Sequence, residues 1–166
     1  MRATVTIFIL ITSSWTFWST GLANTIFHPE AVNPLTESWR WKHFPELDGK
    51  GVRSISEGPD QRIWLSFNQG VYEYDGYSWR LHDENTGLIG LPVEQVLATA
   101  NGQVYATTSE GVFSYQGDHW EPLFLKPAGV TFQWFKIREL KDGSVVACSN
   151  QGALILRPYE KPALIT

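Results

Sequence analysis

The chain is short of cysteine and of basic residues, and each shortage excludes a class of protein. Cys148 is the only cysteine among 166 residues, so neither an intramolecular disulfide nor a thiolate metal cluster can form. The 13 Lys and Arg residues stand against 17 Asp and Glu, giving a net charge of -4 and no basic stripe for phosphates. We therefore expect no binding to nucleic acid.

Spacings that indicate catalysis or metal binding are also missing. The four histidines are scattered, and none lies three to five residues from another His or from cysteine. Ser56 has no Gly two residues ahead of it, so "SISEG" is not a nucleophile elbow. The acidic run at 83–85 lacks the alternating ligand spacing of a calcium loop. We expect no catalytic residue, no metal and no cofactor in this chain.

The first residues, "MRATVTIFILITSSWTFWSTGLANT", have the pattern of a secretory leader. Arg2 precedes an apolar run, and Gly21 and Ala23 have the spacing that a signal peptidase needs. We predict a signal peptide at 1–23, followed by a linker at 24–38, and hence a periplasmic or otherwise extracytoplasmic protein. An uncleaved anchor or a buried core helix is the alternative.

The rest of the chain repeats itself with a step of 41 residues. The matched sets run over three copies: Ile55, Val96 and Ile137; Asp60, Asn101 and Asp142; Ile63, Val104 and Val145; Gly70, Gly111 and Gly152. Within a copy, apolar residues alternate with a period of 2, as in "VYEY" and "VFSY", which predicts strands. Turn residues such as Asp-Gly and Asn-Gln-Gly separate the strands.

Four short antiparallel strands in every 41 residues predict the blade of a β-propeller. We therefore predict an all-β fold, an incomplete propeller over 39–166 with about two and three-quarter blades. The blades are expected at 52–82, 93–124 and, lacking its outer strand, 134–158. An orphan outer strand is expected at 39–45, because "SWRW" resembles "SWRL" at the start of the outer strand near residue 79. A closed ring would need further blades, expected from the remainder of a longer protein.

The tryptophans and the cysteine have different expected roles. Three tryptophans at repeat positions are expected to pack between blades: Trp64, Trp79 and Trp120. Trp41 and Trp134 lie at less regular positions and are the candidates for stacking a ligand ring. Cys148 aligns with Ser66 and Thr107, so we expect a buried small residue.

The segment "SISEGPDQRIWLSFNQGVYEYDGYSW" resembles the two-component regulator propeller repeat. The matching residues are Asp60, Ile63, Trp64, Asn68, Gly70, Tyr72, Tyr74 and Asp75. The second copy departs from the pattern at 104–105, and the third at 145–146. The resemblance covers about 50–158, which is roughly the extent of the repeats.

This resemblance implies the N-terminal sensing portion of a bacterial signal-transduction receptor, outside the cytoplasm. The output domain would be a histidine kinase or a diguanylate cyclase downstream, and this segment itself would not be an enzyme. Its expected partners are a small molecule or glycan held by propeller loops, the remaining propeller blades, a downstream membrane tether in the inner membrane, and a second receptor in a homodimer. An extracytoplasmic propeller enzyme, such as a lyase or hydrolase, and a protein-interaction scaffold are the alternatives.

Overall fold

The computed structural model of the chain describes residues 33, 36–37 and 40–166. It divides into two units, 1–42 and 43–166, and all strands belong to the second. The predicted signal peptide and nearly all of the predicted linker lie outside the described residues. In the described part, no helix is long and apolar enough to cross a membrane.

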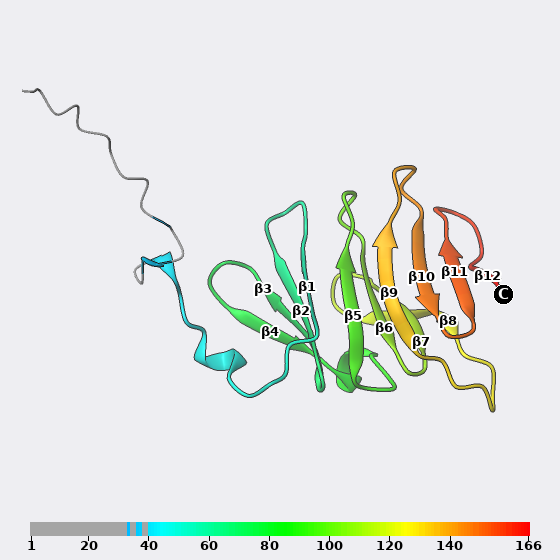
Figure 1. Cartoon of the computed structure of the whole chain (residues 1–166), viewed down its shortest axis with the longest axis horizontal. Coiled ribbons are helices and arrows are strands. Elements are labelled where there is room, and N and C mark those ends of the chain that lie inside the picture. The colour runs from blue at the N-terminus through cyan, green and yellow to red at the C-terminus, as the bar shows by residue number, and fades with distance from the viewer. Residues whose placement is uncertain (1–32, 34–35, 38–39) are drawn as a thin grey trace, which may run out of the picture. The chain divides into compact units, whose positions relative to one another are not determined.

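The second unit contains three antiparallel sheets, each with four strands in sequence order (Figure 1). The first sheet consists of β1 (Ser54–Glu57), β2 (Ile63–Phe67), β3 (Gly70–Tyr74) and β4 (Trp79–His82). The second consists of β5 (Val93–Ala98), β6 (Val104–Thr108), β7 (Gly111–Tyr115) and β8 (Trp120–Leu125). The third consists of β9 (Trp134–Glu139), β10 (Val145–Ser149), β11 (Gly152–Leu156) and β12 (Ala163–Ile165). The expected all-β fold, a partial β-propeller built from four-stranded blades, is confirmed.

Within residues 43–166, two short 3-10 turns lie outside the strands, η3 (Pro45–Leu47) and η4 (Glu84–Thr86). The acidic run that could have offered oxygens to calcium forms η4. Asp83 accepts a hydrogen bond from the backbone N–H of Asn85 at 2.9 Å and so begins this turn. Its carboxylate therefore has a structural partner within the turn.

Glycine explains why the third strand of every blade begins at the same step. Gly70, Gly111 and Gly152 are the first residues of β3, β7 and β11. A Cβ atom on any of them would lie 1.9–2.1 Å from a carbonyl oxygen of the neighbouring outer strand. Only glycine permits so close an approach of two backbones.

The ends of the propeller differ from the sequence prediction in one respect. The third blade was expected to lack its outer strand, but β12 pairs with β11 through Ala153–Ile165 and two further residue pairs. No tryptophan marks β12, which is why the pattern did not reveal it. At the other end, residues 41–44 lie in no strand and Pro45 begins η3. A strand over 39–45 would need partners from beyond residue 166, so it stays a prediction.

The sheets pack face to face, and each contact is an apolar cluster between consecutive blades. The first contact is formed by Trp64 and Val71 of one sheet with residues of the next: Val96, Ala98, Val104, Ala106, Phe113 and Trp120. The second contact joins Val112, with Leu97, Tyr105 and Phe124, to the third sheet: Trp134, Ile137, Val145, Ala147, Leu154 and Leu156. Burial of these side chains drives the blades together.

The first strands of the blades, β1, β5 and β9, lie beside one another (Figure 1). The Ser54 hydroxyl accepts the backbone N–H of Val96 at 2.8 Å, and the Ser56 hydroxyl accepts that of Ala98 at 2.9 Å. Side chains of one blade thereby satisfy the edge backbone of the next, as buried or half-buried N–H groups require.

The outermost faces of the first and third sheets remain open in the described part of the chain. Ile55 is 68% exposed, whereas its equivalents Val96 and Ile137 are each only 4% exposed. The third sheet shows the same contrast: Cys148 is exposed, although Ser66 is fully buried by the next blade. The prediction that Cys148 is buried was wrong, because no described blade covers that face.

Candidate functional site

Comparison of equivalent positions in the three blades separates scaffold residues from candidates for function. A residue type that recurs every 41 residues serves the fold, whereas a polar residue that breaks the repeat at a buried place needs another explanation. The first blade has three polar residues that break the repeat, Arg62, Glu73 and His82, and the last two are buried. In the second blade the same places hold Gln103, Ser114 and Phe124.

Glu73 is the centre of this cluster. Its side chain is 3% exposed on β3, facing the second blade. The guanidinium of Arg62 donates a hydrogen bond to Glu73 Oε1 and also pairs with Asp60 Oδ2 at 2.9 Å. This contact with Glu73 raises the pKa of Arg62. A buried carboxylate is tolerated because it has a charged partner.

His82 completes the cluster from β4, with 1% of its surface exposed. Its Nε2 lies 2.9 Å from Glu73 Oε2, and its ring packs against Trp64, Tyr115 and Trp120 at centroid distances of 5.7, 5.0 and 6.1 Å. Burial lowers the pKa of His82, and the Glu73 contact only partly opposes this. The ring is therefore neutral at pH 7, with Nε2–H donating to the carboxylate. Its Nδ1 is buried and has no partner among the described residues.

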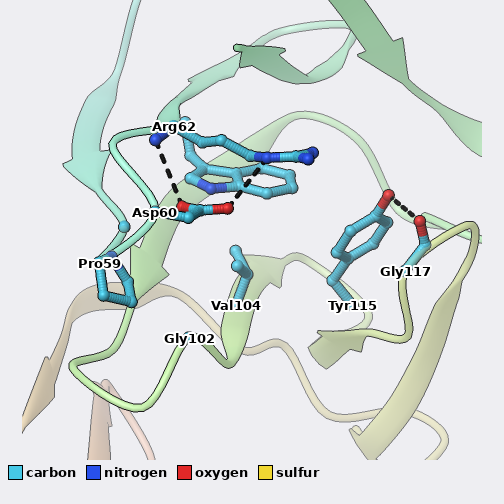
Figure 2. A pocket seen from close by; sticks show the side chains of 9 residues that line it. Pro59, Asp60, Arg62, Gly102, Val104, Tyr115 and Gly117 are labelled. Carbon is cyan, nitrogen blue, oxygen red and sulfur yellow. Dashed lines mark hydrogen bonds and ion pairs between the residues drawn. The ribbon is translucent and has the colours of Figure 1, made fainter.

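A cavity of about 200 Å³ opens beside the cluster, between the first and second blades (Figure 2). It is lined by Gly58, Pro59, Asp60, Arg62, Trp64, Gly102, Val104, Tyr115 and Gly117. Both blades contribute, and Figure 2 shows Arg62 on one side with Tyr115 on the other. Tyr115 donates its hydroxyl to the carbonyl of Gly117. The cavity therefore combines charged groups and aromatic rings at the turn end of a blade interface.

A second, smaller cavity of about 90 Å³ lies on the other side of Arg62, lined by Glu73, Asp75, Ser78 and Arg80. Because Arg62 borders both cavities, its side chain lies between them. Arg62 is thus the residue that the linings of these two cavities share.

Asp60 has a scaffold role as well. Its Oδ1 accepts the backbone N–H two residues ahead at 3.3 Å, and Asn101 and Asp142 do the same in their own turns at 3.1 and 3.0 Å. Such side-chain bonds stabilise tight turns. Arg62, Glu73 and Tyr115 are therefore better candidates for recognition than Asp60.

A histidine with two nearby carboxylates is His119, in the turn before β8. Its Nδ1 contacts Asp118, and its Nε2 lies 3.2 Å from Glu121. Bonds to Asp118 and then Glu121 raise the pKa of His119. Both ring nitrogens therefore have a carboxylate partner in this turn. Within the described residues, no group of three His, Cys, Asp or Glu side chains could hold a metal ion.

The two predicted ring-stacking residues differ in exposure. Trp41 is exposed and belongs to the first unit. Trp134 is buried, stacked on Phe132 at a centroid distance of 5.3 Å and edge-on to Phe124 at 6.1 Å. Its ring faces are covered by the core. The cluster at Glu73 was missed from the sequence altogether.

These features define part of a β-propeller with an unrepeated acid–base cluster beside an inter-blade cavity. A scan of protein-family models finds no match, nor does a search of curated proteins. Among solved structures, the extracellular domain of a protein described as a hybrid two-component system from B. thetaiotaomicron aligns with TM-score 0.55 and 21% identity. The alignment covers 69% of this chain and only 17% of that one. A second such extracellular domain from the same organism aligns with TM-score 0.47 and 16% identity, over 76% of this chain and 23% of that one.

Proposed function

We propose that the chain is part of the extracytoplasmic sensing region of a bacterial signal-transduction receptor. In this proposal the cavity beside Arg62 binds a small molecule or glycan, and a kinase or cyclase elsewhere in the receptor gives the output. The fold shared with an extracellular domain of a two-component system supports the class. The observation that carries the proposal is the Arg62–Glu73–His82 cluster, in which Glu73 and His82 are buried and which the repeat does not need.

The site has the composition expected for a polar ring such as a sugar. Arg62 offers donors for hydroxyl groups, and Tyr115 offers a ring and a hydroxyl oxygen that can accept. Because the lining comes from two blades, an occupant would contact both and change how tightly they pack. A propeller is rigid within each blade, so the interface between blades is where a ligand can bias the conformation.

Arg62→Gln is the test of this site, because Gln103 holds the same place in the second blade and the scaffold accepts glutamine there. The purified chain is screened by thermal shift against a panel of mono- and oligosaccharides, and hits are measured by calorimetry. We expect a saccharide that raises the melting temperature of the chain and binds Arg62→Gln at least about tenfold more weakly.

Lys161→Gln, an exposed change near β12, is the matched control and should bind as the unchanged chain does. Equal affinity of Arg62→Gln and the control for every hit would contradict a site at Arg62. The absence of any binding from the panel would contradict the glycan part of the proposal.

A further inference from the structure

The turn between the first two strands has the same backbone conformation in all three blades. These turns are residues 58–61, 99–102 and 140–143. In each, the backbone N–H of the last residue donates to the carbonyl oxygen of the first, at 3.0, 2.9 and 3.0 Å. The last residue has a positive φ in every blade: +66° for Gln61, +87° for Gly102 and +80° for Gly143.

Gln61 is the residue that departs from this pattern. Two of the three turns use glycine, which adopts a positive φ without a steric penalty. A glutamine in the left-handed region places its Cβ atom close to the backbone, which is unfavourable, and it is not one of the residue types that tolerate this conformation best. A strained residue at a position where the fold accepts glycine indicates that its side chain has a function.

Gln61 also lies at the cavity between the first and second blades. Its neighbours Asp60 and Arg62 both line that cavity, and Gln61 is exposed between them. The equivalent turn of the second blade lies opposite, because a Cβ atom on Gly102 would be 3.8 Å from Pro59 (Figure 2). The side-chain amide of Gln61 has no hydrogen-bond partner within the described residues, so it is available to a ligand.

The amide supplies hydrogen bonds that its two neighbours do not. Arg62 can only donate, and one of its donors is already held by Asp60 at 2.9 Å. Asp60 can only accept, and its other oxygen accepts a backbone N–H of the turn. A sugar hydroxyl both donates and accepts, and the Gln61 amide matches it with a donor and an acceptor in one plane.

The charges around the cavity indicate which kind of saccharide fits. The linings of the two cavities that share Arg62 hold two arginines and three carboxylates: Arg62 and Arg80 against Asp60, Glu73 and Asp75. The balance is therefore one negative charge, and no positive charge is left over for a carboxylate or sulfate group on a ligand. An uncharged ring avoids this repulsion.

We propose that the cavity binds an uncharged saccharide and that the amide of Gln61 is a specificity-determining contact with its hydroxyl groups. The inference rests on the proposed function and names the ligand class and a further residue of the same site. It does not depend on what covers the first or third sheet, because both walls of the cavity belong to described blades.

Calorimetry on the purified chain at low salt tests the ligand class. The probes are glucose, galactose and mannose, as methyl glycosides and as disaccharides, each paired with the uronic acid of the same configuration. We expect a neutral sugar to bind and its uronic acid to bind about fivefold or more weakly, because its charge meets a surplus of carboxylates. A uronic acid that binds as tightly as its neutral partner overturns the uncharged class.

Gln61→Gly and Gln61→Ala test the residue. Both remove the amide, so each should bind the neutral sugar about fivefold or more weakly. Only glycine also relieves the strain, so Gln61→Gly should have the higher urea midpoint of the two. Tyr159→Gly is the matched control, because Tyr159 has φ +64° in the turn between β11 and β12, outside the cavity. It should bind the sugar as the unchanged chain does.

The possible failures are distinguishable. Unchanged binding in both Gln61 variants overturns the role of the amide but leaves the cavity as the binding site. Weaker binding in Gln61→Gly alone assigns the effect to a looser turn and also overturns it. A lower urea midpoint for Gln61→Gly than for Gln61→Ala overturns the argument from strain. If no saccharide binds, this inference falls together with the glycan part of the proposed function.

Discussion

Replacing Glu73 and His82 together should disturb the fold less than replacing Glu73 alone. The second blade suggests the substitutions: the equivalents there are Ser114, which is buried, and Phe124, which is half-buried against the apolar cluster between the second and third blades. In the single variant Glu73→Ser, the buried His82 loses the partner of its Nε2, while its Nδ1 already lacks one. Arg62 is 44% exposed and can regain water, so its loss is smaller.

The expected cost of Glu73→Ser is about 2–4 kcal/mol in the free energy of unfolding, because a charged hydrogen-bond network is broken and a buried ring nitrogen is left unpaired. His82→Phe alone should cost about 1–2 kcal/mol, since Glu73 keeps its bond to Arg62. The double variant should lie within about 1 kcal/mol of the unchanged chain, because replacing a buried polar pair by a packed apolar residue is often neutral. The coupling between the two sites would then be roughly 2–5 kcal/mol, well above the additivity limit.

Urea unfolding followed by tryptophan fluorescence measures these energies, since Trp64 and Trp120 flank the cluster. The pH dependence gives an independent check. The pKa of His82 is lowered from 6.5 by folding, so the unfolded chain binds the proton more readily, and stability should fall as pH drops below about 6.5. The double variant should lose this part of the pH dependence. Additive single effects, or an unchanged pH profile in the double variant, would refute the account of a coupled cluster.

Two further predictions concern the glycines and the leader. Gly111→Ala should destabilise the fold by about 2 kcal/mol or more, because its Cβ would lie 1.9 Å from the carbonyl oxygen of Phe124 and β8 would have to move. Gly117→Ala is the control, because its Cβ would meet nothing within 4 Å while its φ is +99°. It should cost only about 1–2 kcal/mol, from backbone strain alone. Equal urea midpoints for the two variants would argue against a clash between the Cβ at position 111 and β8. Expressed from its own start in bacteria, the chain should be recovered outside the cytoplasm with its mass shortened by residues 1–23, and full-length chain in the cytosol would contradict the predicted leader.

The repeat made most of the fold predictable from sequence, because each strand carries the period-2 pattern and each turn its own glycine or Asx residue. The first blade was expected at 52–82, and its observed strands begin at Ser54 and end at His82. The missed strand β12 is only three residues long and has no aromatic residue at the position marked by tryptophan in the other blades. A strand this short can be recognised only from its hydrogen-bonded pairing with β11 in the structure.

The candidate site was harder to foresee, and the reason is a shift in register. A strict step of 41 aligns His82 with Leu123, so the histidine looks like one polar residue on an outer strand. In the structure, β7 and β8 pair with an irregularity at Val112/Phe113, and the true equivalent of His82 is Phe124, which packs against the apolar cluster between the second and third blades. Only the pairing shows that a titratable residue stands where the repeat places a core residue. Glu73 was overlooked because alternation alone does not say which of the two faces of a blade is buried.

The hydroxyls of Ser54 and Ser56 restrict what the first strands can recognise. An exposed sheet edge binds an extended peptide by offering its free backbone donors and acceptors to a new strand. On β5, the donors of Val96 and Ala98 are already held by these two hydroxyls at 2.8 and 2.9 Å. A peptide laid along β5 would have to displace both serines before it could add to the sheet. Recognition along β5 must therefore rely on side chains. A ligand there would be selected by its functional groups and not by backbone hydrogen bonds to an added strand.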